Sequence, residues 1–166
     1  MSKANEAEPA SGNPAANPDN PAPEATAEAV RHAMFANDRA SQMLGIQVEK
    51  IGPGTATLSM TVRADMLNGF AICHGGLMTT LADSAFAFAC NSRNDVTVAA
   101  SITVDFLAAA KEHDVLTAVA SEVSLAGSTG LYDVTITDQT GKRVAVFRGR
   151  SHRMKGRQVF TPSAGN

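Results

Sequence analysis

The sequence of 166 residues contains no tryptophan, one tyrosine and only two cysteines. Cys73 and Cys90 lie too far apart for a C-x-x-C redox pair, and two thiols do not build a disulfide framework, so we expect reduced thiols. No apolar run approaches the roughly 18 residues that a membrane helix requires. The sequence therefore argues against a protein that spans a bilayer.

Several motifs of common enzyme classes are also missing. There is no P-loop, no G-x-G-x-x-G and no G-x-S-x-G, which excludes the common phosphate-binding loops and the hydrolase nucleophile elbow. The four histidines lack the spacing of metal ligands. We therefore expect neither a metal nor a cofactor. The formal net charge of -2 argues against general nucleic-acid binding.

The charge that is present is unevenly placed along the chain. Beyond Asp138 there is no acidic residue, whereas seven of the fourteen lysines and arginines lie there. This bias predicts a positively charged patch near the C-terminus.

The composition indicates one domain between two tails. The hydrophobic content of 44% suits a single core. Residues 1–29 hold five of the seven prolines and no large apolar side chain except Met1. We expect a disordered tail at 1–26, a domain at 27–154 and a flexible tail at 155–166. The first segment resembles neither a secretory signal nor a transit peptide, which predicts a cytoplasmic protein.

Hydrophobic periodicity predicts two helices and six strands. An amphipathic helix is expected at 27–43, and a helix buried over most of its circumference at 75–91. A strand pair at 46–51 and 55–62 encloses Gly52-Pro53-Gly54, which is typical of a hairpin turn. Period-two alternation predicts strands at 98–107, 114–124, 131–137 and 143–151, joined as an antiparallel meander. The expected fold is α+β, with a curled antiparallel sheet wrapped around a long central helix.

The start of the buried helix offers hydrogen-bond donors. Gly75 and Gly76 allow close backbone approach to a ligand, and a helix N-terminus has unpaired N–H groups with a partial positive charge. The Gly75 N–H, with that of Gly76, is a candidate oxyanion hole for an attacked carbonyl. The alternative, which a glycine pair by itself favours, is a tight loop-to-helix turn.

Asp83 strengthens the catalytic interpretation. No lysine or arginine lies one helical turn away, and a carboxylate is rarely buried without a partner. Burial would raise its pKa toward the range of a general base or a nucleophile. The alternative is a partly exposed acid that bonds to Thr79 or Thr80.

The spacing of these groups predicts a shared site. Gly75 and Asp83 are eight residues apart, which is about 12 Å along one helix. One carbonyl cannot contact both groups, so the two that serve one substrate should come from different chains. A two-fold dimer follows if both are catalytic.

Four further residues are weaker candidates. Asn68 can donate to a carbonyl, but Asn68-Gly69 is also a turn signal. His74 can act as a base or can orient Asn68. Cys73 beside His74 invites a nucleophile interpretation, although adjacent residues rarely align as a Cys/His pair. Ser101 has the pattern of an ordinary polar strand position.

Taken together, these residues carry a family resemblance. Asn68, His74-Gly75-Gly76, Leu81-Ala82-Asp83 and Cys90-Asn91 resemble the hotdog-fold acyl-CoA thioesterases, most closely the phenylacetic-acid-degradation subfamily. The similarity runs over residues 44–152 and includes the segments 104–107 and 146–152.

The resemblance implies a function and a role for each residue. It implies hydrolysis of small aryl- or hydroxyaryl-acetyl-CoA, with Asp83 as base or nucleophile and the Gly75 N–H polarising the thioester carbonyl. It further implies that Asn68 holds the carbonyl or orients the water, that His74 supports Asn68, and that Ser101 helps to place the water. The implied assembly is a dimer with shared sites, usually paired into a tetramer.

A coenzyme A ester also needs a cationic site for its phosphates. Arg148 and Arg150 share a strand face and are candidates, with solvated edge charges as the alternative. The turn at Gly127, Ser128 and Thr129 can present backbone N–H groups to the same ligand or can simply close a hairpin. The rival functions are a hotdog acyl-CoA hydratase and a non-catalytic acyl-CoA-binding protein.

Overall fold

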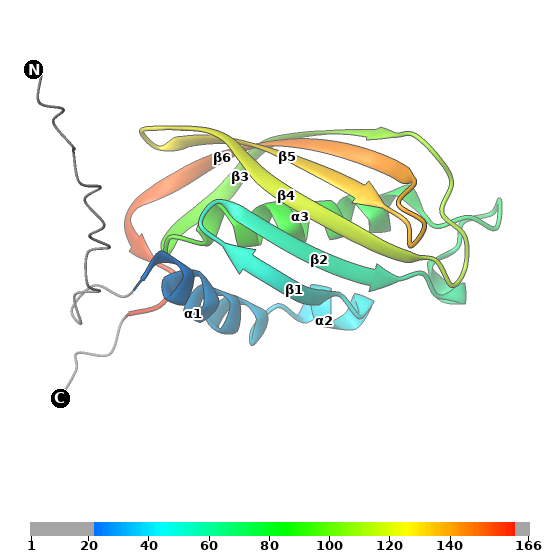
Figure 1. Cartoon of the computed structure of the whole chain (residues 1–166), viewed down its shortest axis with the longest axis horizontal. Helices are drawn as coiled ribbons and strands as arrows, with labels where there is room; N and C mark the ends of the chain where they lie inside the picture. The colour runs from blue at the N-terminus through cyan, green and yellow to red at the C-terminus, as the bar shows by residue number, and fades with distance from the viewer. Residues whose placement is uncertain (1–21, 162–166) are drawn as a thin grey trace, which may run out of the picture.

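A computed structural model describes residues 22–161 as a curled antiparallel sheet that wraps around one long helix (Figure 1). The six strands are hydrogen-bonded in the order β1-β2-β4-β5-β6-β3. The strands are β1 (Gln47–Gly52), β2 (Thr55–Thr61), β3 (Asp95–Phe106), β4 (Val115–Ala126), β5 (Thr129–Thr137) and β6 (Arg143–Gln158). The helices are α1 (Pro23–Phe35), α2 (Arg39–Leu44) and α3 (Gly75–Asn91), with a 3-10 turn η1 (Ala64–Met66). The predicted α+β fold is confirmed.

The central helix α3 has the boundaries that the sequence predicts. Nine of its 17 residues are buried inside the curl of the sheet. Its first turn is stabilised by His74, whose side chain caps the helix, and by Thr79 and Thr80, whose hydroxyls donate to the carbonyls of Gly75 and Gly76. Its apolar composition therefore fixes both its length and its place in the core.

The helix predicted at 27–43 is two helices. α1 ends at Phe35, and Asp38 begins α2 by accepting a hydrogen bond from the backbone N–H of Ser41 at 3.0 Å. Such an N-cap starts a new helix because the side chain satisfies an unpaired donor. α1 also begins at Pro23, so residues 23–26 of the predicted tail are helical. The rest of that tail, 1–21, lies outside the described residues.

The predicted meander is wrong for β3. β4, β5 and β6 are joined by tight turns as expected, but β3 crosses to the far edge of the sheet and pairs with β6. β6 also extends to Gln158, through four residues that the sequence assigned to the C-terminal tail. The extension is held by Asn94, whose side chain both donates to and accepts from the backbone of Phe160 at 3.0 Å.

The placement of β3 leaves an apolar sheet edge uncovered within the described residues. Val98, Ile102 and Phe106 are each between 44% and 52% exposed. An edge strand with unpaired backbone groups and apolar side chains is a template for pairing with another strand.

None of the helices in residues 22–161 is long and apolar enough to cross a membrane. Among the same residues, no group of three or more His, Cys, Asp or Glu side chains has the arrangement of a metal site. The expected cytoplasmic location stays a prediction.

Candidate active site

The first turn of α3 leaves one backbone donor unused. His74 Nδ1 accepts a hydrogen bond from the Gly76 N–H at 3.0 Å, so Gly76 is not the second oxyanion donor that the sequence suggested. Leu77 N–H bonds to the His74 carbonyl at 2.9 Å. Among the described residues the Gly75 N–H has no acceptor, and the start of a helix favours negative charge. Gly75 alone therefore fits the role of oxyanion donor.

Gly75 lines a cavity of about 390 Å³. Asn68, Met78, Phe106 and Leu107 also line it. A Cβ on Gly75 would lie 2.9 Å from the Phe106 ring, so only glycine lets the helix start and this ring approach so closely. Phe106 was not identified as a site residue from the sequence, although it lies in the 104–107 segment that carries part of the resemblance.

The Asn68 side chain closes its own loop. Its Oδ1 accepts from the Phe70 N–H at 2.9 Å, and its backbone N–H donates to the Ile72 carbonyl at 2.8 Å. The turn interpretation is therefore correct, and the expected support from His74 is not what the structure shows, because the His74 side chain caps Gly76 instead. Asn68 lines the same cavity as Gly75, and its amide NH₂ makes no hydrogen bond among the described residues, so these donors are free to serve a ligand.

Asp83 is exposed in the single chain, contrary to the expected burial. The sheet that curls around α3 does not cover Asp83 within residues 22–161. Thr79 and Thr80 donate to backbone carbonyls one turn back rather than to Asp83. Partial desolvation nevertheless raises the pKa of the Asp83 carboxyl above its ordinary value.

Asp83 borders a second cavity, of about 500 Å³, that is separate from the one at Gly75. Phe86, Ala87, Cys90 and Asn91 continue its wall along α3. The two candidate catalytic groups thus lie about 12 Å apart on one helix and open into different cavities. A single chain does not assemble them around one carbonyl.

The two thiols are poor nucleophiles. Burial raises the pKa of the Cys90 thiol to about 12, and burial also raises the pKa of Cys73. A thiol attacks as its thiolate, which is scarce at neutral pH in both environments. The nucleophile interpretation of Cys73 is therefore disfavoured.

Ser101 and Asp83 are not brought together within one chain. Ser101 lies beyond a bulge in β3 and pairs with Arg150 of β6. The β3 residues that line the Asp83 cavity are Val96, Thr97, Val98 and Ala99. The role of Ser101 in placing water stays a prediction.

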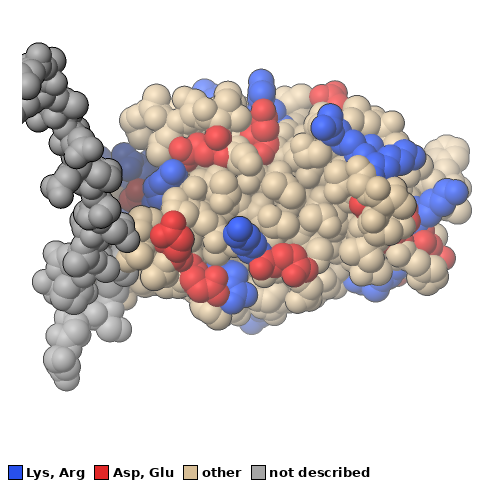
Figure 2. Space-filling view, in the orientation of Figure 1, with Lys and Arg blue, Asp and Glu red and all other residues tan. Residues whose placement is uncertain are grey.

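The predicted basic patch is partly neutralised. Arg148 forms two hydrogen bonds, of 2.6 and 2.7 Å, with Asp133 of β5, and this pairing lowers the pKa of Asp133. The sequence segment is free of acids, but the neighbouring strand supplies one. Figure 2 shows acidic and basic side chains interspersed on the face in view. Arg150 has no ion pair among the described residues and is the stronger candidate for a phosphate.

The turn at Gly127, Ser128 and Thr129 closes the β4–β5 hairpin. Its carbonyls at Gly127 and Ser128 accept hydrogen bonds from Arg153. Arg153 in turn pairs with Asp95 at 3.2 Å. The structure thus gives this turn a hairpin role, and its contact with a ligand stays a prediction.

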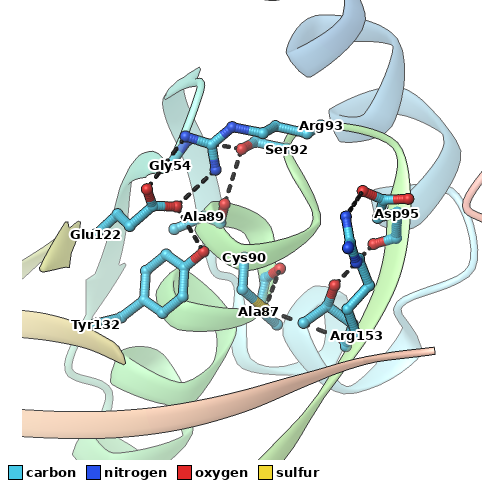
Figure 3. A network of polar contacts seen from close by, with 11 residues as sticks. Gly54, Ala87, Ala89, Cys90, Ser92, Arg93, Asp95, Glu122, Tyr132 and Arg153 are labelled. Atoms are coloured by element: carbon cyan, nitrogen blue, oxygen red, sulfur yellow. Dashed lines mark hydrogen bonds and ion pairs between the residues drawn. The ribbon is translucent and has the colours of Figure 1, made fainter. Parts of the chain in front are cut away.

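A polar network holds the C-terminal end of α3 in place (Figure 3). Arg93 pairs with Glu122 of β4 at 2.6 Å, and the Tyr132 hydroxyl donates to the same carboxylate at 2.9 Å. The Ser92 hydroxyl accepts from the Gly54 N–H at 2.8 Å. These contacts tie the C-terminal end of α3 to the β1–β2 turn, to β4 and to β5.

The raised pKa of Asp83 has a consequence for stability. When a carboxyl has a higher pKa in the folded protein than in the unfolded chain, the folded protein becomes less stable as the pH rises from the unfolded-state pKa to the folded-state pKa. We expect Asp83→Asn to raise the melting temperature at pH 7, and this gain to vanish at pH 3, where the wild-type carboxyl is protonated. Calorimetry at both pH values measures this, and a lower melting temperature for the variant at pH 7 contradicts it.

The sheet wrapped around α3, with a free N–H at the helix start and an acid two turns further on, defines a hotdog-fold thioesterase. Residues 70–145 match the Thioesterase superfamily. The chain is 47% identical over 125 residues to the acyl-coenzyme A thioesterase PaaI of Escherichia coli (strain K12), covering 75% of this chain and 89% of that protein. The chain belongs to the thioesterase superfamily and, within it, to the PaaI-like acyl-CoA thioesterases.

Solved structures agree with this assignment. The E. coli PaaI protein, from the phenylacetic acid degradation operon, superposes with a TM-score of 0.80 at 44% identity, covering 82% of this chain and 99% of that one. A hypothetical thioesterase from Streptococcus pneumoniae TIGR4, solved with coenzyme A, gives a TM-score of 0.65 at 27% identity, covering 68% and 91%.

Proposed function

We propose that this thioesterase hydrolyses small arylacetyl-CoA esters to the free acid and coenzyme A, at sites shared between two chains. One observation carries the proposal: α3 has an N–H at Gly75 that is unpaired among residues 22–161 and, two turns further on, a carboxyl of raised pKa at Asp83. These are the donor and the base that attack on a thioester carbonyl requires. The phenylacetic acid degradation operon of the E. coli relative supports the arylacetyl group.

The reaction follows from these groups. The Gly75 N–H and the Asn68 NH₂ polarise the carbonyl, and Asp83 either accepts a proton from the attacking water or attacks the carbonyl itself. The carbon–sulfur bond breaks, and coenzyme A leaves as its thiolate and takes a proton. If water attacks, its oxygen bonds directly to the acyl carbon and gives the free acid. If Asp83 attacks, its carboxylate oxygen bonds to the acyl carbon, and a water molecule then cleaves this anhydride to the free acid and Asp83. Arg150 is proposed to contact the phosphates of the substrate.

A homodimer through the β3 edge explains how the site is completed. Within residues 22–161 the edge is apolar and uncovered. We propose that two such edges pair and that this pairing brings the α3 start of one chain against Asp83 of the other. Burial of Asp83 at that contact would raise its pKa further. A pair of such dimers would form the tetramer that the resemblance implies.

The direct test is release of coenzyme A from phenylacetyl-CoA, followed with a thiol reagent. We expect steady release by the wild-type protein. A hydratase would add water to an enoyl-CoA and release no thiol, and a binding protein would bind the ester without turnover. Either of those results contradicts the proposal.

The shared site can be tested with two inactive variants. Asp83→Asn removes the base, and Gly75→Pro removes the N–H, because proline has none. After unfolding and refolding of an equal mixture, we expect about a quarter of wild-type activity, since half of the dimers are mixed and each has one intact site of two. Separately tagged chains verify that mixed dimers form. Verified mixed dimers without recovered activity contradict the shared site.

A further inference from the structure

One wall of the cavity beside Asp83 is formed by α1 and not by α3 or the sheet. Its volume is about 500 Å³, within the range of about 300–1,000 Å³ for small-molecule sites. α3 contributes Asp83, Phe86 and Ala87, whereas Ala33 and Met34 line it from α1. An N-terminal helix therefore borders the space next to the proposed base.

This wall is anchored to the core. Ala27 and Val30 of α1 have no exposed surface. Beyond α1, the Ser41 hydroxyl donates to Asp38 at 2.6 Å and lies 3.0 Å from the Ser84 hydroxyl, one residue from Asp83. The corner between α1 and α2 is thus tied to the part of α3 that carries the acid, so α1 holds a defined position over the cavity.

The polar groups of this cavity are largely engaged. The Asn91 side chain donates to the carbonyls of Ala87 and Thr97 and accepts from the Thr97 N–H, at distances of 2.8 to 2.9 Å. Cys90 is a neutral thiol because burial raises its pKa to about 12. Beyond the Asp83 carboxylate, the cavity along α3 offers mainly apolar surface, which suits an acyl group and not the phosphates of coenzyme A.

We propose that this cavity receives the acyl group of the substrate and that Met34, with Ala33 beside it, closes the cavity from the α1 side and limits acyl size. This inference rests on the proposed function: if Asp83 activates water or attacks the thioester, the acyl carbon lies next to Asp83 and the rest of the acyl group extends into this cavity. From Asp83 to Asn91 the α3 wall is about 12 Å long, which accommodates an aromatic ring and its methylene group. Met34 then excludes acyl groups that extend beyond such a ring.

The test compares variants over acetyl-, phenylacetyl-, 4-phenylbutyryl- and decanoyl-CoA. Met34→Ala removes the end of the side chain without disfavouring the helix, and we expect the kcat/KM ratio of 4-phenylbutyryl- to phenylacetyl-CoA to rise about tenfold, as a change of a few methylene groups produces. Ala33→Leu fills the cavity, and we expect the ratio of acetyl- to phenylacetyl-CoA to rise by a similar factor.

Met43→Ala is the matched control. Met43 is 71% exposed on α2 and does not line the cavity, so the same substitution there should leave both ratios unchanged. If both Met34→Ala and Ala33→Leu still release thiol and show unchanged ratios, α1 does not limit acyl size. The proposed function is unaffected by that result. Absence of thiol release from every ester in the wild-type protein defeats the proposed function instead.

Discussion

Asp83→Asn lowers kcat for phenylacetyl-CoA hydrolysis by about 10²–10⁴-fold, which is the expected contribution of a positioned general base. Asparagine keeps the size of the side chain but neither accepts a proton from water nor attacks a carbonyl. A larger loss follows if Asp83 forms the anhydride, because the variant then has no nucleophile at all. Thiol release under saturating substrate gives kcat directly.

Two controls separate this effect from a loss of structure. Asp138→Asn makes the same exchange in the turn between β5 and β6, where the carboxyl bonds only within its own turn, and should retain wild-type kcat. Asp83→Asn itself should bind the substrate with little change, since the binding groups are intact. Wild-type turnover in Asp83→Asn would show that another group activates the water.

Gly75→Pro lowers kcat/KM by about 10²–10³-fold relative to Gly75→Ala, because loss of one oxyanion donor has that effect. Gly75 is the first residue of α3, where proline is favoured since its N–H is not needed for the helix. His74 has extended backbone angles (φ -62°, ψ 127°), which a residue before proline adopts readily. The substitution thus removes the donor and keeps the helix.

Gly75→Ala is the matched control because it adds the same Cβ and retains the N–H. That Cβ would lie 2.9 Å from the Phe106 ring, whose outer end can move because Phe106 is 52% exposed. Both variants therefore disturb Phe106 alike, and only one lacks the donor. Circular dichroism establishes that both fold. Equal rates in the two folded variants would remove Gly75 from the proposed mechanism.

Local sequence signals predicted those parts of the fold that depend on neighbours in the chain. The apolar pattern at 75–91 gave α3 its boundaries, because a helix buried on most sides has few polar positions. The break between α1 and α2 was missed, although Asp38 three residues before Ser41 is a capping signal. The position of β3 was missed for a different reason. The alternation of apolar and polar residues predicts a strand but does not indicate which strands it pairs with in the sheet.

The candidate site likewise has features that the sequence predicted and features that only the folded structure decided. The sequence alone placed a glycine at the start of a buried helix and an acid eight residues further on, and helix geometry predicts two chains if both groups serve one substrate. The pairing of Gly76 with His74, the engagement of the Asn68 oxygen and the neutralisation of Arg148 by Asp133 were decided by contacts that spacing does not specify.

By itself, then, the sequence determined most of the secondary structure around the site, because this follows from periodicity, and its motifs carried the resemblance to the family. Only the tertiary structure decided that, in the first turn of α3 and among the described residues, the Gly75 N–H alone lacks an acceptor, that Asp83 is exposed, and that α1 borders its cavity. The physical reason is that hydrogen-bond partners and burial belong to pairs of segments brought together by folding, and no local pattern contains that pairing.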